Sequence, residues 1–483
     1  MGYVSSENKY QMTLQPMCLD DYVGEDNICR VIEAYVKSLD LTALGFKYAK
    51  TKDNGRPPYN PATMLCLYIY GYMNRIRSSR RLESEAHRNL EVIWLLEKLT
   101  PDDKTICNFR KDNAVALKGA FREFSLWCNR QGLYGRELVV VDGTKIRANN
   151  SRRKIHTKKN TEMFLASVEK KISEYMKKLE ENDASEQNEP EFSSEAVQDV
   201  LARLRERKTE LEGWRDRIYQ NSGVEIAEID TDCRMMKQGG NARPLDACYN
   251  VQTVVDEKNK LIVDFDVTNC PDEKGALPKM TESAKEIMCV SELTVLADKG
   301  YYDPEDITEC ERNQTTCFVS SMISGVRAPV PEYDHDAFRY DKEHDCYICP
   351  IGKEIPFKRI KKSGKLIGRE YHNSTACYGC PEHTKCTKGK RARAIFRNPN
   401  QDALDVVDAR MRGDEGRRIY KKRKEIVEHP FGTTKRTWGF GNFICRGREK
   451  TTGEQSLVFL AYNFRRVVNI FNRTGENLEV ALT

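Results

Sequence analysis

The sequence predicts an α/β protein, in which a mixed-sheet core carries a helical hairpin and a cysteine-rich insertion behind an all-α N-terminal region. Apolar runs that end in an acid, at 138–142 and 293–298, are typical of buried strands. Apolar residues recur at helical spacing from Ala62 to Trp127, and a near-heptad stripe follows at 158–220. Because strand-like and helix-like periods follow one another along the chain, we expect helices packed around a sheet.

The composition narrows the class of protein. Of the 483 residues, 31% are charged, and the mean hydropathy is −0.67. No apolar run approaches the roughly 20 residues that span a bilayer, and "MGYVSSENKYQM" at the start lacks the apolar core of a secretory signal. The net charge is only +6, but residues 388–450 hold 18 Lys or Arg against 8 Asp or Glu. This segment is either a surface for a polyanion or a solvated basic face.

Short helices joined by tight turns are predicted in the N-terminal region. The N-cap pattern in "TPDDKTICNFRKDN" (100–113) begins the last long helix, and shorter ones are expected before it, near 28–39, 79–88 and 91–97. The arrangement fits a helix-turn-helix type of DNA-binding domain or an ordinary helical bundle. Under the first interpretation, the exposed cations that face DNA are Arg80, Arg81, Arg110 and Lys111.

Residues 158–220 predict an antiparallel helical hairpin inserted between strands. Apolar residues keep the near-heptad spacing on both sides of the polar, turn-like segment "ENDASEQNEPEFSS" (181–194). The hairpin could hold DNA, hold a second protomer or act as a structural spacer, and the spacer is the favoured interpretation.

Strand patterns return after the hairpin. Two apolar segments flank "DEKNK" within 247–267 and predict a β-hairpin, and a helix is expected at 276–290. Residues 320–410 are irregular and contain clustered cysteines. Helical spacing resumes at about 413, and the chain closes with an amphipathic helix in "SLVFLAYNFRRVVNIF".

Asp142 and Asp298 follow the same pattern, since each ends an apolar strand and precedes a small or basic turn. Either one alone is most simply a turn residue or an N-cap. Two such carboxylates on neighbouring strands would repel each other unless a cation lies between them, and Mg²⁺ prefers carboxylate oxygens. A third acid would come from the basic helix after 413, where Glu428 and Glu425 are also candidates for surface ion pairs. Carboxylates that hold two Mg²⁺ ions catalyse in-line phosphoryl displacement.

Taken together, these motifs resemble the DDE transposases of bacterial insertion sequences, which have a ribonuclease H-like catalytic core. "VVVDGTKIRANNS" is similar to the motif of the first Asp, and "LTVLADKGYYD" to that of the second, with its Asp-x-Gly-Tyr. "YKKRKEIVEHPFGTTKR" resembles the signature that carries the Glu, and "DKTICNFRK" resembles the end of the helical N-terminal domain. The resemblance covers most of the chain.

The resemblance implies the site residues. The catalytic triad, which would bind Mg²⁺ or Mn²⁺, is then Asp142, Asp298 and Glu428, and the accessory residues near the DNA phosphates are Tyr420, Arg423 and Lys435. The commonest form of the signature has three residues between the Arg and the Glu, whereas four separate Arg423 from Glu428, so Lys424 is an alternative to Arg423. Further contacts to DNA are expected just past Asp142, from Asn149, Asn150, Arg152 and Arg153.

The clustered cysteines predict a second metal site. "CYICP" (346–350) and "CYGCPEHTKC" (377–386) contain two CxxC pairs with zinc-ribbon-like spacing. The candidate ligands of a structural Zn²⁺ are Cys346, Cys349, Cys377, Cys380 and Cys386, with His383 as a sixth. A reduced loop without metal is the alternative. The remaining cysteines are scattered singly and indicate a reducing compartment, the bacterial cytoplasm, with the protein on the nucleoid when it binds DNA.

The resemblance also implies an activity and a domain plan. A helical DNA-binding domain (1–130) would precede a ribonuclease H-like core (136–303 and 413–475), with insertions at 158–220 and 320–410. The expected function is to bind the inverted-repeat ends of an insertion sequence, hydrolyse them to free 3′-hydroxyls and transfer those strands into target DNA, as a homodimer or larger assembly. The alternatives are a nuclease with the same core but without strand transfer, and a repurposed DNA-binding protein without catalysis.

Overall fold

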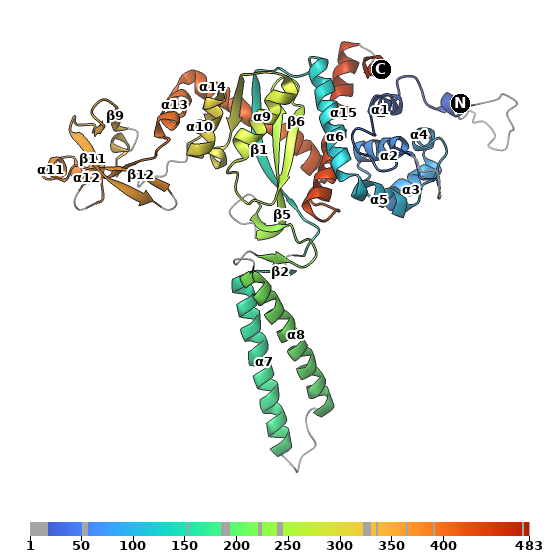
Figure 1. Ribbon diagram of the computed structural model, residues 1–483, viewed down its shortest axis with the longest axis horizontal. Helices are drawn as coiled ribbons and strands as arrows, with labels where there is room; N and C mark the ends of the chain where they lie inside the picture. The colour runs from blue at the N-terminus through green and yellow to red at the C-terminus, as the bar shows by residue number, and fades with distance from the viewer. Residues whose placement is uncertain are drawn as a thin grey trace, which may run out of the picture.

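The computed structural model describes most of the chain. The described residues are 18–50, 57–151, 154–184, 194–220, 225–238, 245–321, 330–334, 337–363, 366–389, 392–475 and 478–482. None of the described helices has the length and apolar character needed to cross a membrane. Figure 1 shows a central sheet covered by helices, a group of small helices on one side, a small sheet on the other, and a long helical hairpin that projects from the centre.

The N-terminal region is helical. Its elements are η1 (Leu19–Tyr22), α1 (Ile28–Lys37), α2 (Pro61–Met73), α3 (Ser79–Arg88), α4 (Leu90–Leu95), α5 (Asp103–Asp112) and α6 (Ala114–Arg130). Side chains of Asn27, Asn60 and Asp102 accept hydrogen bonds from backbone N–H groups of the first turns and so begin α1, α2 and α5. Helix α2 is buried along most of its length, which explains why its sequence is apolar almost all round.

The central sheet has the order β4-β5-β1-β7-β8, with β6 also paired to β5. Strand β1 runs antiparallel to β5 and parallel to β7, β5 and β6 are antiparallel, and β7 and β8 are parallel. The sheet is therefore mixed, as the sequence predicts. The bounds are β1 (Leu138–Arg147), β4 (Arg234–Lys237), β5 (Leu245–Asp256), β6 (Ile262–Thr268), β7 (Leu293–Ala297) and β8 (Thr315–Val319).

Helices cover the central sheet. The long helix α15 (Arg448–Thr474) packs against α6, α2 and β6 and joins the sheet to the N-terminal helices (Figure 1). Val139, Val140 and Val141 are fully buried, which is why β1 is a continuous apolar run up to Asp142. The other elements around the sheet are α9 (Ala276–Met288), η3 (Lys299–Tyr301), α10 (Pro304–Arg312), α13 (Gln401–Arg412), α14 (Asp414–Phe431), η6 (Gly432–Thr437) and α16 (Leu478–Leu482).

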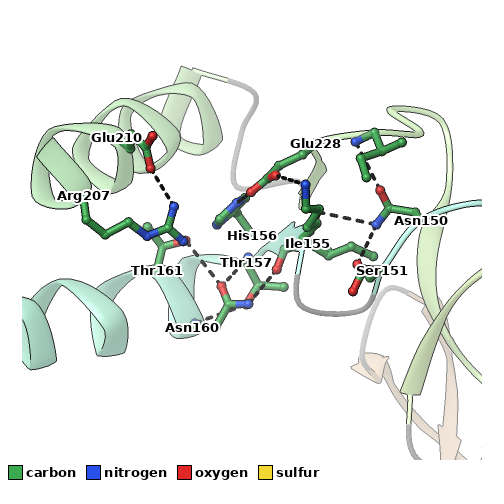
Figure 2. A network of polar contacts seen from close by, with 12 residues as sticks. Asn150, Ser151, Ile155, His156, Thr157, Asn160, Thr161, Arg207, Glu210 and Glu228 are labelled. Carbon is green, nitrogen blue, oxygen red and sulfur yellow. Dashed lines mark hydrogen bonds and ion pairs between the residues drawn. The ribbon is translucent and has the colours of Figure 1, made fainter. Parts of the chain in front are cut away.

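Two long helices, α7 (Lys158–Ala184) and α8 (Ser194–Gln220), lie side by side where the sequence predicts a hairpin. The short strands β2 (Ile155–His156) and β3 (Ile226–Ala227) pair antiparallel at its base. Figure 2 shows the polar contacts there: Nε2 of the buried His156 lies 2.8 Å from Oε1 of Glu228. The His156 ring also stacks on Trp214, with centroids 4.9 Å apart. These contacts fix the base of the hairpin to the strands that follow β1.

A second, smaller sheet lies at the far side of the central sheet from the N-terminal helices (Figure 1). It has the order β13-β12-β11-β10-β9 and its own apolar cluster of Phe338, Tyr347, Ile355, Tyr371 and Ile395. Its elements are η4 (Pro331–Tyr333), β9 (Arg339–Asp341), β10 (Cys346–Ile348), β11 (Glu354–Ser363), β12 (Leu366–Tyr371), α11 (Ser374–Cys377), α12 (His383–Cys386) and β13 (Ile395–Arg397).

Candidate active site

Asp142 and Asp298 lie next to each other at the edge of the central sheet. Val141 of β1 pairs with Ala297 of β7, and the two strands are parallel. The next residue on each strand is an aspartate, so backbone pairing alone brings the two acids together. The sequence predicts that both strands end at their aspartates, which holds for β7. The prediction is wrong for β1, which continues to Arg147 because Asp142–Arg147 pair with β5. The two acids are nevertheless neighbours, where the pairing of β1 with β7 ends.

Local hydrogen bonds hold both carboxylates. The backbone N–H of Gly143 donates to Oδ1 of Asp142 at 3.0 Å. The backbone N–H of Gly300 donates to Oδ1 of Asp298 at 2.7 Å, so Asp298 is the N-cap of the short helix η3. Tyr301, at the end of the Asp-x-Gly-Tyr motif, is buried and its hydroxyl donates to Oε1 of Gln252. The motif is therefore a turn anchored under the sheet by its tyrosine.

The negative charges of Asp142 and Asp298 repel each other. Burial, and then repulsion by Asp298, raise the pKa of Asp142 to about 6, against the opposing attraction of Arg423. Nη1 of Arg423 lies 3.9 Å from Oδ2 of Asp142, and the two side chains are only 22% and 20% exposed. One arginine at this distance offsets part of the repulsion, and a further cation at the pair would offset more.

Helix α14 supplies Arg423 and Tyr420 to the pair. The Arg423 guanidinium carbon is 5.9 Å from the centre of the Tyr420 ring. Burial raises the pKa of Tyr420, and the charge of Asp298 adds to this shift while Arg423 opposes it. Lys424, the alternative to Arg423, instead lies 3.8 Å from Glu428 on an exposed part of the helix. Of the two candidates for the arginine position, the structure thus brings only Arg423 to Asp142.

Lys435 reaches strand β1 beside the aspartates. Its Nζ donates to the hydroxyl of Thr144 and to the carbonyl oxygen of Lys145, both at 2.8 Å. It therefore lies two to three residues along β1 from Asp142. The accessory residues predicted from the signature, Tyr420, Arg423 and Lys435, all lie around the strand ends.

The structure does not bring the predicted third acid to the pair. The Glu428 side chain is 68% exposed and its oxygen faces Lys424, while Glu425 is 79% exposed and lies 4.0 Å from Lys260. Glu428 lies five positions after Arg423, which places the two side chains about 140° apart around an α-helix at 3.6 residues per turn. With Arg423 turned to Asp142, Glu428 turns outward, and its catalytic role stays a prediction.

A different acid, Glu273, lies at this edge of the sheet. Its Oε1 accepts a hydrogen bond from Lys145 at 2.7 Å, and its charge helps to raise the pKa of Asp142. A Cβ added to Gly300 would lie 2.8 Å from Oε2 of Glu273 and 2.9 Å from Oδ1 of Asp298. A side chain at position 300 would displace one of these two carboxylates. The sequence analysis missed Glu273 because it lies in a loop before α9 that has no periodic pattern.

Within the described parts of the chain, no three His, Cys, Asp or Glu side chains are arranged to hold a metal ion by themselves. The acidic site thus consists of a close pair, Asp142 and Asp298, with Glu273 beside it. Two carboxylates suffice for Mg²⁺ when phosphate oxygens of a substrate complete its coordination.

Comparison with known families identifies the chain. Residues 348–468 match the family described as "Transposase DDE domain", and residues 17–112 match "Transposase domain (DUF772)". The chain belongs to the DDE transposases of insertion-sequence type. No curated protein matches this transposase. A solved structure with which it shares 8% identity is titled "Cryo-EM structure of piggyBac transposase synaptic complex with hairpin DNA (SNHP)"; the match covers 94% of this chain and 78% of that chain, with a TM-score of 0.33.

The cations predicted to face DNA divide into three groups. Arg80, Arg81 and Lys111 of the transposase are exposed, and Arg80 lies 3.3 Å from Asp103. The prediction that Arg110 is exposed is wrong: it is 2% exposed, and its guanidinium donates to the hydroxyl of Tyr72 and the carbonyl oxygen of Arg77. It fastens α5 to α2. Arg152 and Arg153 lie outside the described residues.

The two asparagines after Asp142 make structural contacts. The side-chain amide of Asn149 donates to the carbonyl oxygen of Ile444 at 2.7 Å. Asn150 accepts hydrogen bonds from the backbone N–H groups of Ile229 and Asp230, as part of the network that Figure 2 shows. Both amides therefore tie the end of β1 to neighbouring segments of the transposase.

Four of the five candidate zinc ligands line one pocket in the small sheet region. The pocket is bounded by thiols and by apolar side chains such as Phe338 and Ile355, and its cysteines are Cys349, Cys377, Cys380 and Cys386. Cys346 is buried in β10 and does not line this pocket. The thiol of Cys349 also accepts a hydrogen bond from the backbone N–H of Lys353 at 3.2 Å. All seventeen cysteines are free thiols.

Proposed function

We propose that this transposase binds the inverted-repeat ends of an insertion sequence, hydrolyses them in a Mg²⁺-dependent reaction to free 3′-hydroxyls, and joins those strands to target DNA. The observation that carries the proposal is the β1–β7 register, which puts Asp142 and Asp298 side by side at a sheet edge. Both reactions displace an oxygen at phosphorus, so one carboxylate site serves both.

The sheet supports a ribonuclease H-like catalytic core. Strand β5 runs antiparallel to both β6 and β1, and β7 and β8 continue the sheet parallel to β1. This order places Asp142 of β1 beside Asp298, which follows β7. The proposed core would combine residues 136–303 with 413–475, because α14 supplies Arg423 to Asp142.

Asp142 and Asp298 would hold the divalent metal, Mg²⁺ or Mn²⁺, together with phosphate oxygens of the DNA. When bound, the metal polarises the phosphoryl group and activates the attacking oxygen. The chain's own residues orient these acids: the backbone amides of Gly143 and Gly300 hold the carboxylates, and Arg423 balances part of their charge. Lys435 and Tyr420 flank the position that a DNA strand would take. Two DNA ends and a target imply a dimer or a larger assembly.

The third acid is proposed to be Glu428, as the family signature implies, with Glu273 as its competitor. Binding of DNA would have to turn Glu428 from its outward position, since it now faces Lys424. Glu273 needs no such change, because its carboxylate and that of Asp298 both lie beside Gly300. The two assignments differ in which substitution abolishes the reaction.

Cleavage of a labelled duplex that carries the element's own ends tests the proposal. We expect Asp142→Asn to lower the Mg²⁺-dependent rate by about a thousandfold or more, since loss of a metal contact removes several kcal/mol from the transition state, while end binding persists. Glu428→Gln and Glu273→Gln decide the third acid, and Glu425→Gln is the matched control on the same helix. An unlabelled target duplex in the same assay reports strand transfer and separates a transposase from a nuclease.

The outcomes are distinct. Equal cleavage by the wild type and Asp142→Asn would refute the catalytic site. Binding of the ends without cleavage by any variant, wild type included, would favour a repurposed DNA-binding protein. Cleavage without joining to the target would favour a nuclease.

We also propose a structural Zn²⁺ on the four thiols of the shared pocket, Cys349, Cys377, Cys380 and Cys386, with Cys346 excluded. A set of four thiols matches the closed site that structural zinc prefers. As placed, the sulfurs are not arranged to hold an ion, so binding would draw them together. Free thiols throughout the chain fit the expected reducing cytoplasm.

A further inference from the structure

The small sheet carries a ribbon that is only two strands wide. Strand β10 pairs with β11 at residues 354–356 alone, and β13 pairs with β12 at 369–371 alone. Between these contacts, residues 357–363 of β11 pair only with β12 in the described part of the chain. Figure 1 shows β11 and β12 in the small sheet, well away from the central sheet. We name residues 357–363 and 366–369 the β-ribbon.

The β-ribbon is strongly basic. Residues 353–371 contain seven Lys or Arg and two Glu. Of the two acids, Glu370 is 3% exposed and is bonded to Arg359 and Lys361 on one face of the ribbon. Arg369 in turn pairs with Asp345, which precedes β10. The charge that remains toward solvent is positive, and a polyanion is the partner that this charge attracts.

The opposite face of the β-ribbon combines cations with exposed apolar side chains. Ile360 is opposite Arg369, and Lys362 is opposite Ile367, so these four side chains share one face. Ile360 is 70% exposed and Ile367 is 60% exposed. Lys358 lies in a bulge between Phe357 and Arg359, where it has no partner in the register, and it is exposed. The two isoleucines therefore place apolar surface between the cations of this face.

We propose that this face of the β-ribbon binds duplex DNA. The B-form major groove admits a two-stranded ribbon, lysines and arginines at its edges contact phosphates, and apolar side chains contact thymine methyl groups. The inference rests on the proposed function only for its partner, DNA, and adds a contact surface that lies outside the catalytic site and the N-terminal helices. The β-ribbon is then an additional surface with which the transposase binds duplex DNA.

Binding of full-length protein to a fluorescent random-sequence duplex of about 30 base pairs tests the proposal. Anisotropy is measured between about 50 and 200 mM NaCl, where phosphate contacts dominate, in buffer without added Mg²⁺ or Mn²⁺ and without chelator, so that no cleavage occurs and the proposed structural zinc is kept. We expect Lys358→Glu with Lys362→Glu to weaken binding at least about tenfold. The slope of log affinity against log salt should decrease by about two, since each lost phosphate contact removes ~0.9. Ile360→Ala with Ile367→Ala should weaken binding without changing the slope.

Lys342→Glu is the matched control, because Lys342 is 81% exposed in the same region but pairs with Asp402 of α13, outside the ribbon. Affinity and salt slope of the ribbon variants equal to those of this control would overturn the proposal. If the ribbon variants bind DNA more weakly but the cleavage test fails, the proposed function is refuted and DNA binding by the β-ribbon is supported. If the ribbon variants bind DNA normally but Asp142→Asn loses cleavage, the proposed function is supported and DNA binding by the β-ribbon is refuted.

Discussion

The two sheets of this protein are built in opposite ways. The central sheet is covered by helices, and Val140 and Leu296 in its neighbouring strands β1 and β7 are fully buried. Among the described residues, the small sheet has an apolar cluster of five buried side chains, and Ile360 on it is 70% exposed. In the first sheet, the apolar runs of β1 and β7 are buried, and Asp142 and Asp298 lie where the pairing of these two strands ends. In the second, charge covers the strands, so its cations are available to a partner.

This contrast indicates different sources of stability. Burial of apolar surface on both faces can hold the central sheet by itself. A cluster of five side chains is small for an independent unit, and regions with so small a core usually depend on metals or disulfides. The free thiols of the small sheet region make a metal the candidate.

Removal of zinc should have the largest effect and should act on the small sheet alone. Structural zinc binds with about 10–16 kcal/mol in small domains. We expect the purified protein to contain one zinc per chain, Cys349→Ser to lose it, and Cys346→Ser to keep it, because only the former lines the thiol pocket. Elemental analysis measures the metal, and limited proteolysis within 337–397 measures the local unfolding. Protein without zinc, or equal loss in both variants, would contradict the proposed ligand set.

A truncation in each sheet tests the contrast in burial. Leu296→Ala in β7 removes a fully buried side chain and should lower the free energy of unfolding by about 2–5 kcal/mol. Ile360→Ala removes an exposed one and should change it by less than about 0.5 kcal/mol. Urea denaturation monitored by the intrinsic fluorescence of the protein compares the two. Equal losses would show that the small sheet is packed against something in solution.

Neutralising Asp142 should stabilise the protein, although it removes the proposed metal ligand. The pKa of Asp142 is about 6 in the folded chain and about 4 when unfolded. The folded state therefore binds more protons between these values, so its stability falls as the pH rises from 4 to 6. Asp142→Asn should recover up to ~3 kcal/mol at pH 7 and nothing at pH 4, in buffer without divalent metal.

Thermal unfolding across this pH range measures the effect. Asp414→Asn is the control, because Asp414 is a fully exposed carboxylate at the start of α14, and its replacement should leave the profile unchanged. A destabilised Asp142→Asn protein at pH 7 would mean that the hydrogen bond from Gly143 or the attraction of Arg423 outweighs burial and repulsion by Asp298.

Much of the architecture was predictable from local patterns. The strand segments that lead to Asp142 and Asp298 were recognisable because a strand buried on both faces is a continuous apolar run, although β1 continues past Asp142 to Arg147. The long helices of 158–220 were recognisable from their repeating apolar stripe. The match of two transposase families confirms the resemblance that these motifs carried.

The errors and omissions concern residues whose environment comes from distant parts of the chain. The sequence predicts that Arg110 is a surface residue, because it lies near the end of a polar helix. In the structure, its hydrogen bonds are accepted by the hydroxyl of Tyr72 and the carbonyl oxygen of Arg77, which lie more than thirty residues earlier in the chain. Glu273 has no local signal, because only the packing of its loop against Gly300 brings it to Asp298.

By itself, the sequence determined which segments are buried strands and amphipathic helices, since periodicity is a local property of the chain. It also determined that an aspartate follows the apolar run of each of two strands. Only the tertiary structure decided that those strands are neighbours, that Arg423 and not Lys424 meets Asp142, and that Cys346 is apart from the other four cysteines. The reason is physical: which side chains share a site depends on strand pairing and on how each helix is rotated against the sheet, and contacts between distant residues set both.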